Sequence, residues 1–146
     1  MRIFNGQFYN QIVKGKNLQL RTSIRTAEVF PVGKWVHVAA SYDHNTGKNS
    51  LYINGHFGVS QNIGKGFEIA TTPPNVMMGV TIERNNAYFK GKIAEMKVYD
   101  VALNEAQIQT SIRQGSCTFP EIIVSSRSPM IPLIIQTPII AQPRKR

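Results

Sequence analysis

The sequence is poor in cysteine, in acidic residues and in long uninterrupted apolar stretches. Its single cysteine, Cys117, excludes a disulfide bond within the chain and any metal cluster built from several thiolates. Only 8 of the 146 residues are Asp or Glu against 17 Lys or Arg, so the formal net charge is +9. Residues 1–11 lack the apolar stretch of a secretory signal peptide. These absences leave the cellular compartment open.

The most apolar region, residues 119–141, is interrupted by Pro120, Pro129, Pro132 and Pro138. A helix that crosses a bilayer needs about 20 mainly apolar residues whose backbone groups are bonded internally. Proline removes a backbone donor and breaks such a helix. We therefore expect no membrane span here.

What the sequence does contain is an excess of β-branched residues, with 17 isoleucines and 11 valines against 5 leucines. Such side chains favour strands over helices, and a hydrophobic content of 42% is enough for a packed core. The length fits one domain. We expect a β-domain over residues 1–114 and a Pro/Ile-rich basic tail or arm over residues 115–146.

Alternating apolar residues and turn signals predict strands over residues 12–13, 18–24, 35–42, 50–54, 56–61, 76–80 and 92–99. The run 35–42 has few polar breaks, which indicates a strand buried on both faces. Asn54-Gly55 predicts a type I′ hairpin turn. Asn104 and Gln107 form a capping-box pattern at the start of one helix that ends before Gly115.

The order of these signals resembles a laminin-G-like domain of the concanavalin A-like lectin/glucanase superfamily over roughly residues 12–113. The residues that carry the resemblance are Gly33-x-Trp35-x-His37-Val38-Ala39, Leu51-Tyr52-Ile53-Asn54-Gly55, Phe89-x-Gly91-x-Ile93-x-Glu95-Met96 and Ala102-Leu103-Asn104. The resemblance implies an all-β jelly-roll β-sandwich of two antiparallel sheets, here with one short C-terminal helix and an extended Pro-rich tail. It implies an extracellular or cell-surface setting, or a large assembly. Residues 1–10 leave room for about one of the usual opening strands, so we expect these to be short or missing.

No catalytic residues are expected. The glucanase relatives carry Glu-x-Asp-x-Glu on one strand, and this chain has no such triplet. Its nearest pair, Glu95 and Asp100, is five residues apart and would point to opposite faces of a strand. The resemblance implies that calcium is a candidate cofactor, but Ala94 stands where relatives often have an acid, and no metal ligand set is evident. We therefore expect no cofactor and no enzyme activity.

Polar and aromatic residues of two expected loops are the candidate ligand contacts. Sugar recognition uses amide and imidazole groups for hydroxyls and an aromatic face for the apolar side of the ring. The residues are Asn85, Asn86, Tyr88, His44 and Asn45. The alternative is that these asparagines only supply turn conformations. Trp35 and His37 are interpreted as framework residues of the core.

Basic residues near the C-terminal side are candidate contacts for a polyanion or a partner: Lys90, Lys92, Arg144, Lys145 and Arg146. The charges are dispersed along the chain, so a solvated basic face is the alternative, and nucleic acid is disfavoured as a partner.

Two functions fit the sequence. The first is a non-catalytic binding module that recognises carbohydrate or protein. The second is a structural subunit of a larger assembly, anchored through its C-terminal arm. An apolar segment such as residues 117–146 is expected to pack either on its own sandwich or on a neighbouring subunit, because an extended strand can add to an exposed sheet edge.

Overall fold

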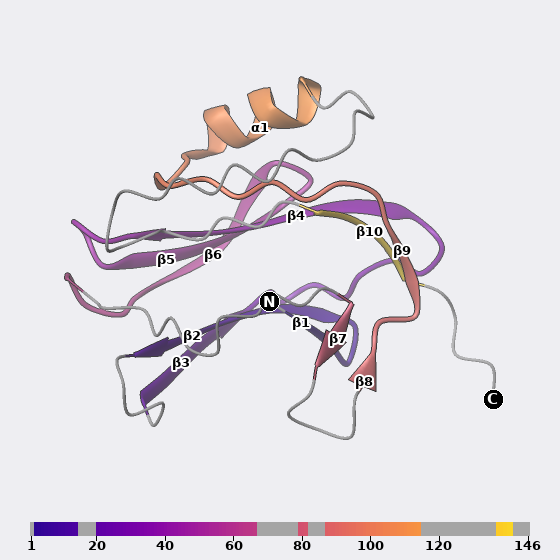
Figure 1. Cartoon of the computed structure of the whole chain (residues 1–146), viewed down its shortest axis with the longest axis horizontal. Helices are drawn as coiled ribbons and strands as arrows, with labels where there is room; N and C mark the ends of the chain where they lie inside the picture. The colour runs from indigo at the N-terminus through magenta and orange to yellow at the C-terminus, as the bar shows by residue number, and fades with distance from the viewer. Residues whose placement is uncertain (1, 15–19, 67–78, 82–86, 115–136, 142–146) are drawn as a thin grey trace.

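The computed structural model describes residues 2–14, 20–66, 79–81, 87–114 and 137–141. Its strands form two stacked antiparallel sheets of three and five strands, and a helix lies on the outside of the larger sheet (Figure 1). A two-stranded ribbon of β7 (Val80–Thr81) and β8 (Ala87–Tyr88) lies at one end. The expected β-sandwich of two antiparallel sheets with one short helix is confirmed.

The smaller sheet contains β1 (Arg2–Phe4), β2 (Gln7–Lys14) and β3 (Leu20–Arg25) in that order. Asn5 and Gly6 join β1 to β2 with φ angles of 49° and 75°, the left-handed conformations of a type I′ turn. The sequence prediction did not use this Asn-Gly pair. It therefore placed the start of the second strand five residues too late.

The larger sheet has the spatial order β6-β5-β4-β10-β9. Its strands are β4 (Trp35–Asp43), β5 (Lys48–Ile53), β6 (His56–Asn62), β9 (Gly91–Ile93) and β10 (Thr137–Ala141). Asn54 and Gly55 connect β5 to β6 with φ angles of 50° and 81°. This hairpin turn is confirmed.

Strand β4 contributes to the core on both of its faces. Val36, Val38 and Ala40 pack in the main core between the two sheets, with Phe8, Ile24, Phe30 and Leu51. Ala39 points the other way and belongs to a second cluster beneath the helix. The prediction of a central strand buried on both faces is confirmed. A slip of one residue would exchange the two faces, so this burial fixes the register of β4.

Helix α1 (Glu105–Arg113) covers the outer face of the larger sheet, where its fully buried Ile108 packs with Leu103 and Tyr52. The Asn104 side chain accepts a hydrogen bond from the backbone N–H of Gln107 at 3.0 Å, and the Gln107 side chain accepts one from the Asn104 N–H at 2.9 Å. The predicted capping box is confirmed, and such a cap stabilises a helix by about 1 kcal/mol. In the part of the chain that the structure describes, no helix is long and apolar enough to cross a membrane.

Strand β10 brings part of the proline-rich C-terminal region into the interior of the larger sheet. It pairs antiparallel with β4 on one side, where Pro138 lies opposite His37. It pairs antiparallel with β9 on the other side, where Ile139 lies opposite Ile93. The sequence left open whether this region packs in cis or on a neighbour, and residues 137–141 pair with their own chain. The remainder of the tail lies outside the described residues.

The backbone of β4 explains how a proline fits inside this sheet. The His37 N–H donates to the Asn54 side chain at 3.0 Å and the His37 carbonyl accepts from the Asn54 N–H at 2.8 Å, so both groups point toward β5. Opposed residues of an antiparallel pair turn their backbone groups either both toward or both away from each other. The nitrogen of Pro138 therefore points away from β4, and the β4–β10 ladder needs no donor there.

The predicted strand over residues 92–99 was wrong beyond Ile93, because β9 ends at that residue. The next β10 residue in the β9–β10 register is Pro138, whose nitrogen faces β9 and carries no hydrogen to donate. The ladder between the two strands stops at this point.

Candidate functional site

The turn between β4 and β5 is held by the carboxylate of Asp43. Its Oδ1 atom accepts the N–H of Asn45 at 2.9 Å and that of Thr46 at 3.4 Å, and its Oδ2 atom accepts the Thr46 hydroxyl at 2.8 Å. The Thr46 hydroxyl does most to lower the pKa of Asp43 below the ordinary aspartate value, the two N–H groups act in the same direction, and burial opposes them. The carboxylate is thus engaged by its own turn.

A second loop packs against this turn. The Ile63 N–H donates to the Gly47 carbonyl at 2.8 Å, and the Gly66 N–H donates to the His44 carbonyl at 3.0 Å. We call residues 43–47 and residues 62–66 the paired loops. These two backbone hydrogen bonds hold the paired loops together.

Gly47 is required at the contact between the paired loops. Its φ angle is 76°, and a Cβ atom added there would lie 2.4 Å from the carbonyl carbon of Gly64. The Gly64 carbonyl oxygen also accepts the hydroxyl of Tyr42 at 3.0 Å. A side chain at position 47 would therefore separate the loops.

His44 and Asn45, two of the predicted ligand contacts, belong to the paired loops. The His44 side chain is half-buried and its Nδ1 atom is buried, while Asn45 is exposed. The backbone carbonyl of His44 and the backbone N–H of Asn45 are already bonded within the loops. Among the described residues, no group bonds the buried Nδ1 atom of His44, and the half-buried His44 ring and the exposed Asn45 side chain remain the candidate contacts at this end.

The other described candidates lie at the opposite end of the sandwich, where β8 leads into β9 (Figure 1). Tyr88 is 71% exposed, and Lys90 and Lys92 are exposed as well. The two predicted ligand loops therefore do not form one continuous site. The remaining candidates lie outside the described residues: Asn85, Asn86, Arg144, Lys145 and Arg146.

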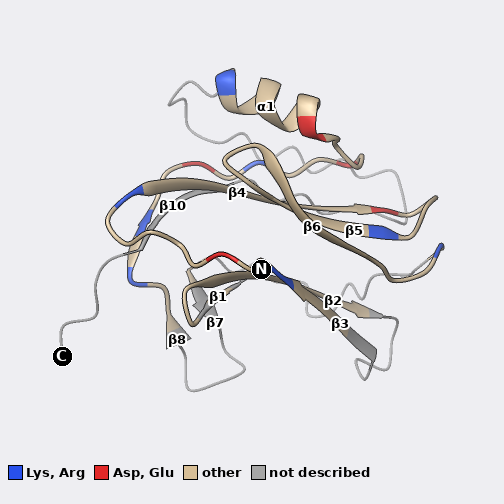
Figure 2. Ribbon diagram, turned by 180° about the vertical axis from the view of Figure 1, so that it is seen from behind, with Lys and Arg blue, Asp and Glu red and all other residues tan. Residues whose placement is uncertain are grey.

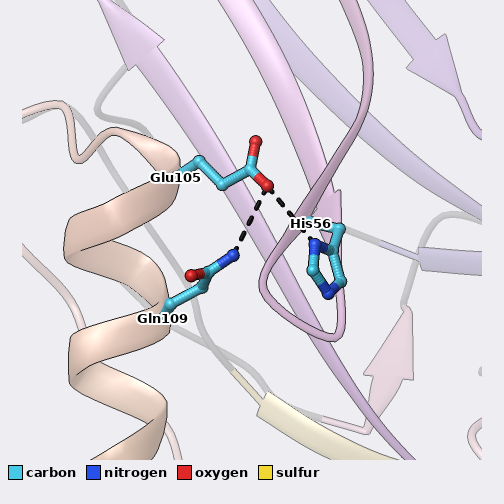
Figure 3. A network of polar contacts seen from close by, with 3 residues as sticks. All are labelled: His56, Glu105 and Gln109. Atoms are coloured by element: carbon cyan, nitrogen blue, oxygen red, sulfur yellow. Dashed lines mark hydrogen bonds and ion pairs between the residues drawn. The ribbon is translucent and has the colours of Figure 1, made fainter.

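Helix α1 is fixed to the β5–β6 hairpin by a small polar network (Figure 3). Oε1 of Glu105 lies 3.3 Å from Nδ1 of His56 and accepts a hydrogen bond from the Gln109 amide at 3.4 Å. Beside it, a Cβ atom added to Gly55 would lie 2.9 Å from the side chain of Ile112. The hairpin tip and the helix are in close contact, so these polar groups support the fold.

A comparison with protein families agrees with this architecture. A laminin G family model, described as the concanavalin A-like lectin/glucanases superfamily, matches residues 1–109. The chain belongs to this superfamily. Searches of curated proteins and of solved structures found no match. The matched range ends within α1, so strand β10 lies outside it.

Membership of the concanavalin A-like superfamily indicates a binding module, although the superfamily also contains glycosidases. Hydrolysis of a glycosidic bond needs two carboxyl groups placed across that bond. Three of the described carboxylates make other contacts: Asp43 holds its turn, Glu105 contacts His56, and Glu95 pairs with Lys97 at 3.2 Å.

Calcium is the one metal that the resemblance implies. Asp43, the acid of the β4–β5 turn, already accepts three hydrogen bonds from its own loop. Over the described residues, no group of three or more His, Cys, Asp or Glu side chains could hold a metal ion. The described residues therefore include no cluster of acidic side chains of the kind that often ligates calcium.

The interpretation of Trp35 as a core residue was wrong, because its side chain is 50% exposed. Val36, Val38 and Ala40 face the main core, so the odd-numbered residues of β4 face outward. The helix cluster covers Ala39 on that outer face and does not include Trp35 at the beginning of the strand. The alternation of the valines was the signal in the sequence that could have placed this side chain.

Proposed function

We propose that this chain is a non-catalytic binding module that recognises a carbohydrate or a protein. The observation that carries the proposal is the combination of a lectin-type sandwich with exposed aromatic and cationic side chains at its β8–β9 end. The contacts made by Asp43, Glu95 and Glu105 favour a structural over a catalytic use of these carboxylates.

Tyr88 is the first candidate contact within this proposal, together with Asn85 and Asn86 that precede it in the sequence. An exposed aromatic ring can pack against the apolar face of a sugar, and amide groups can bond its hydroxyls. His44 and Asn45 rank second, because the His44 carbonyl and the Asn45 N–H are already bonded within the paired loops.

The test is binding of the full chain to a panel of immobilised polysaccharides and extracellular proteins. Once a ligand is found, Tyr88→Ala should weaken its binding about tenfold, because an aromatic contact at the centre of a site carries much of the affinity. Phe57→Ala is the matched control, since Phe57 is a 48% exposed aromatic residue that packs on Tyr52. Failure to bind any member of the panel, or release of reducing sugar from a bound polysaccharide, would contradict the proposal.

The second candidate is a structural subunit anchored through its C-terminal arm. Strand β10 favours this candidate, because it lies outside the family match and yet forms an interior strand of the larger sheet. A segment that completes one sheet can complete the same sheet in another copy. Light scattering of the full chain tests this candidate: a mass that grows with concentration supports it, and a constant monomer mass contradicts it.

A further inference from the structure

The chain has two hairpin turns built from the same Asn-Gly pair. Asn5-Gly6 joins β1 to β2, Asn54-Gly55 joins β5 to β6, and all four residues have positive φ angles. Asparagine is a chemically labile residue. A glycine after it leaves the next backbone nitrogen open to the asparagine side chain, because glycine has no Cβ atom. The two turns therefore share one reactive sequence, and their surroundings decide which of them can react.

The turn at Asn54 is held on two sides. Its Oδ1 atom accepts the His37 N–H at 3.0 Å, and its own N–H donates to the His37 carbonyl at 2.8 Å. A Cβ atom added to the buried Gly55 would lie 2.9 Å from the Ile112 side chain and 3.0 Å from that of Gln109, so helix α1 closes over this glycine. Strand β5 is also an interior strand of its sheet. A change in the conformation of Asn54 would have to break these contacts.

The turn at Asn5 is open. Asn5 is exposed, and its side chain makes no hydrogen bond to another described residue. The turn follows β1, which has three residues and, among the described strands, a neighbour on one side only. Short edge elements open locally at a lower free-energy cost than interior strands. Opening of β1 gives Asn5 the conformational freedom that Asn54 lacks.

The nitrogen of Gly6 stays in place when β1 opens. The Gly6 carbonyl accepts the N–H of Phe30 at 2.7 Å, and Phe30 is buried in the main core. Gly6 also packs on Val29, whose Cγ1 atom would lie 2.5 Å from an added Cβ atom. The Gly6 nitrogen makes no hydrogen bond to another described residue. This nucleophilic nitrogen is thus anchored, while the asparagine beside it can move.

We propose that Asn5 is a site of spontaneous deamidation, and that opening of β1 sets its rate. The Gly6 nitrogen attacks the Cγ atom of Asn5, the Cγ–Nδ2 bond breaks, and ammonia leaves with the proton of the attacking nitrogen. Water is the only co-reactant, and it opens the resulting succinimide ring. Opening at Cγ gives aspartate, and opening at the main-chain carbonyl carbon gives isoaspartate. The inference does not depend on the proposed binding function.

Deamidation changes both the length and the charge of this turn. Isoaspartate adds a further main-chain atom between β1 and β2, so the turn no longer has the geometry of the hairpin. Either product adds a negative charge to a turn that packs on the loop between β3 and β4, which contains Glu28. Figure 2 shows this loop, with its acidic segment, beside β1. Because Ile3 of β1 packs on the main core, the products should hold this part of the core less tightly.

Ageing of the full chain measures the reaction. The chain is incubated in neutral and in mildly alkaline buffer, and ion exchange separates the deamidated molecules, whose formal net charge is lower than +9. Peptide mass spectrometry assigns the site, and an isoaspartyl methyltransferase with labelled S-adenosylmethionine detects isoaspartate. In the folded chain Asn5 should react at least about tenfold faster than Asn54, and in denaturant the two rates should be similar. Alkaline buffer should speed the reaction, because the deprotonated nitrogen is the nucleophile.

Two matched substitutions test the role of β1. Ile3 and Ile112 are both partly buried, and each lies near one of the two Asn-Gly turns. Ile3→Ala should speed deamidation of Asn5 about fivefold, because it lowers the cost of opening β1. Ile112→Ala removes the same atoms beside Gly55 and should leave the Asn5 rate within about twofold of the wild-type rate. Circular dichroism of both variants confirms that each is folded.

The outcomes separate this inference from the proposed function. Equal rates at Asn5 and Asn54 in the folded chain would overturn it, because the contacts of the turns would then not control the reaction. An Asn5 rate that Ile3→Ala leaves unchanged would overturn the role assigned to β1. Deamidation of Asn5 in a chain that binds no glycan and no protein would support this inference and contradict the proposed function. A chain that binds a ligand but keeps Asn5 intact throughout ageing would contradict this inference and leave the proposed function standing.

Discussion

The two ends of the sandwich use their polar residues in opposite ways. At the end of the paired loops, the Asp43 carboxylate, the Thr46 hydroxyl and the Gly47 carbonyl are bonded to one another or to the facing loop. At the other end, Lys34, Lys90 and Lys92 make no ion pair with a described residue and Trp35 is half-exposed. A loop rich in asparagine and histidine is therefore no sign of a ligand site until its hydrogen bonds are assigned.

The largest expected effect tests how tightly the paired loops are built. Gly47→Ala should destabilise the chain by about 3 kcal/mol, because it combines a left-handed φ angle with a Cβ atom 2.4 Å from Gly64. Gly33→Ala is the matched control at the other end, where φ is 78° and no atom lies within 4 Å of the added Cβ. It should cost about 1 kcal/mol. Chemical denaturation measures both values, and equal losses would break the contrast between the ends.

The second prediction concerns β10, the strand that lies between β4 and β9 at the end of the sandwich that carries Lys34, Lys90 and Lys92. His37→Cys/Pro138→Cys, in a Cys117→Ser background, should form a disulfide within one chain, because opposed residues of this type have Cα atoms about 4.5 Å apart. The closed loop should stabilise the chain by about 2–4 kcal/mol. Non-reducing electrophoresis and denaturation of the oxidised and reduced forms provide the measurement. The single-cysteine variants are the controls, and a cross-linked dimer would show that β10 is exchanged between copies.

The smallest effect is a dependence of stability on pH at the paired loops. The folded-state pKa of Asp43 is lowered, so its stabilisation is complete above the ordinary aspartate pKa and is lost as the pH falls through the lowered value. The free energy of unfolding should therefore drop by less than about 1 kcal/mol on this account between about pH 5 and pH 3.

Asp43→Asn isolates that contribution. The difference in stability between the wild-type chain and this variant should shrink over the same pH interval, because an amide does not titrate. A difference that stays constant with pH would show that the carboxylate contributes no charge-dependent stability to the turn.

Local signals in the sequence predicted the local structure well. The capping box of Asn104 and Gln107 and the turn at Asn54-Gly55 each depend on residues a few positions apart, and both form as expected. The turn at Asn5-Gly6 carries the same signal and was open to prediction. The burial of β4 on both faces was predicted correctly, but the alternation of its valines, which could have placed Trp35, was not used.

Features that depend on contacts between residues far apart in the sequence could not be predicted from the sequence. The end of β9 is set by Pro138, which reaches it only because β10 lies between β4 and β9. The same pairing places Lys92 in one row with Trp35. The separation of Tyr88 from His44 also required the fold, because both lie in polar segments that look alike as sequence (Figure 1).

The place of β10 in the sheet has a consequence for protein synthesis. A ribosome makes the chain from its N-terminus, so β4 and β9 emerge long before the strand that separates them. During that interval each presents a row of unpaired backbone groups that other strands can join. Both edges therefore stay open to other strands until residues 137–141 have emerged and paired with them.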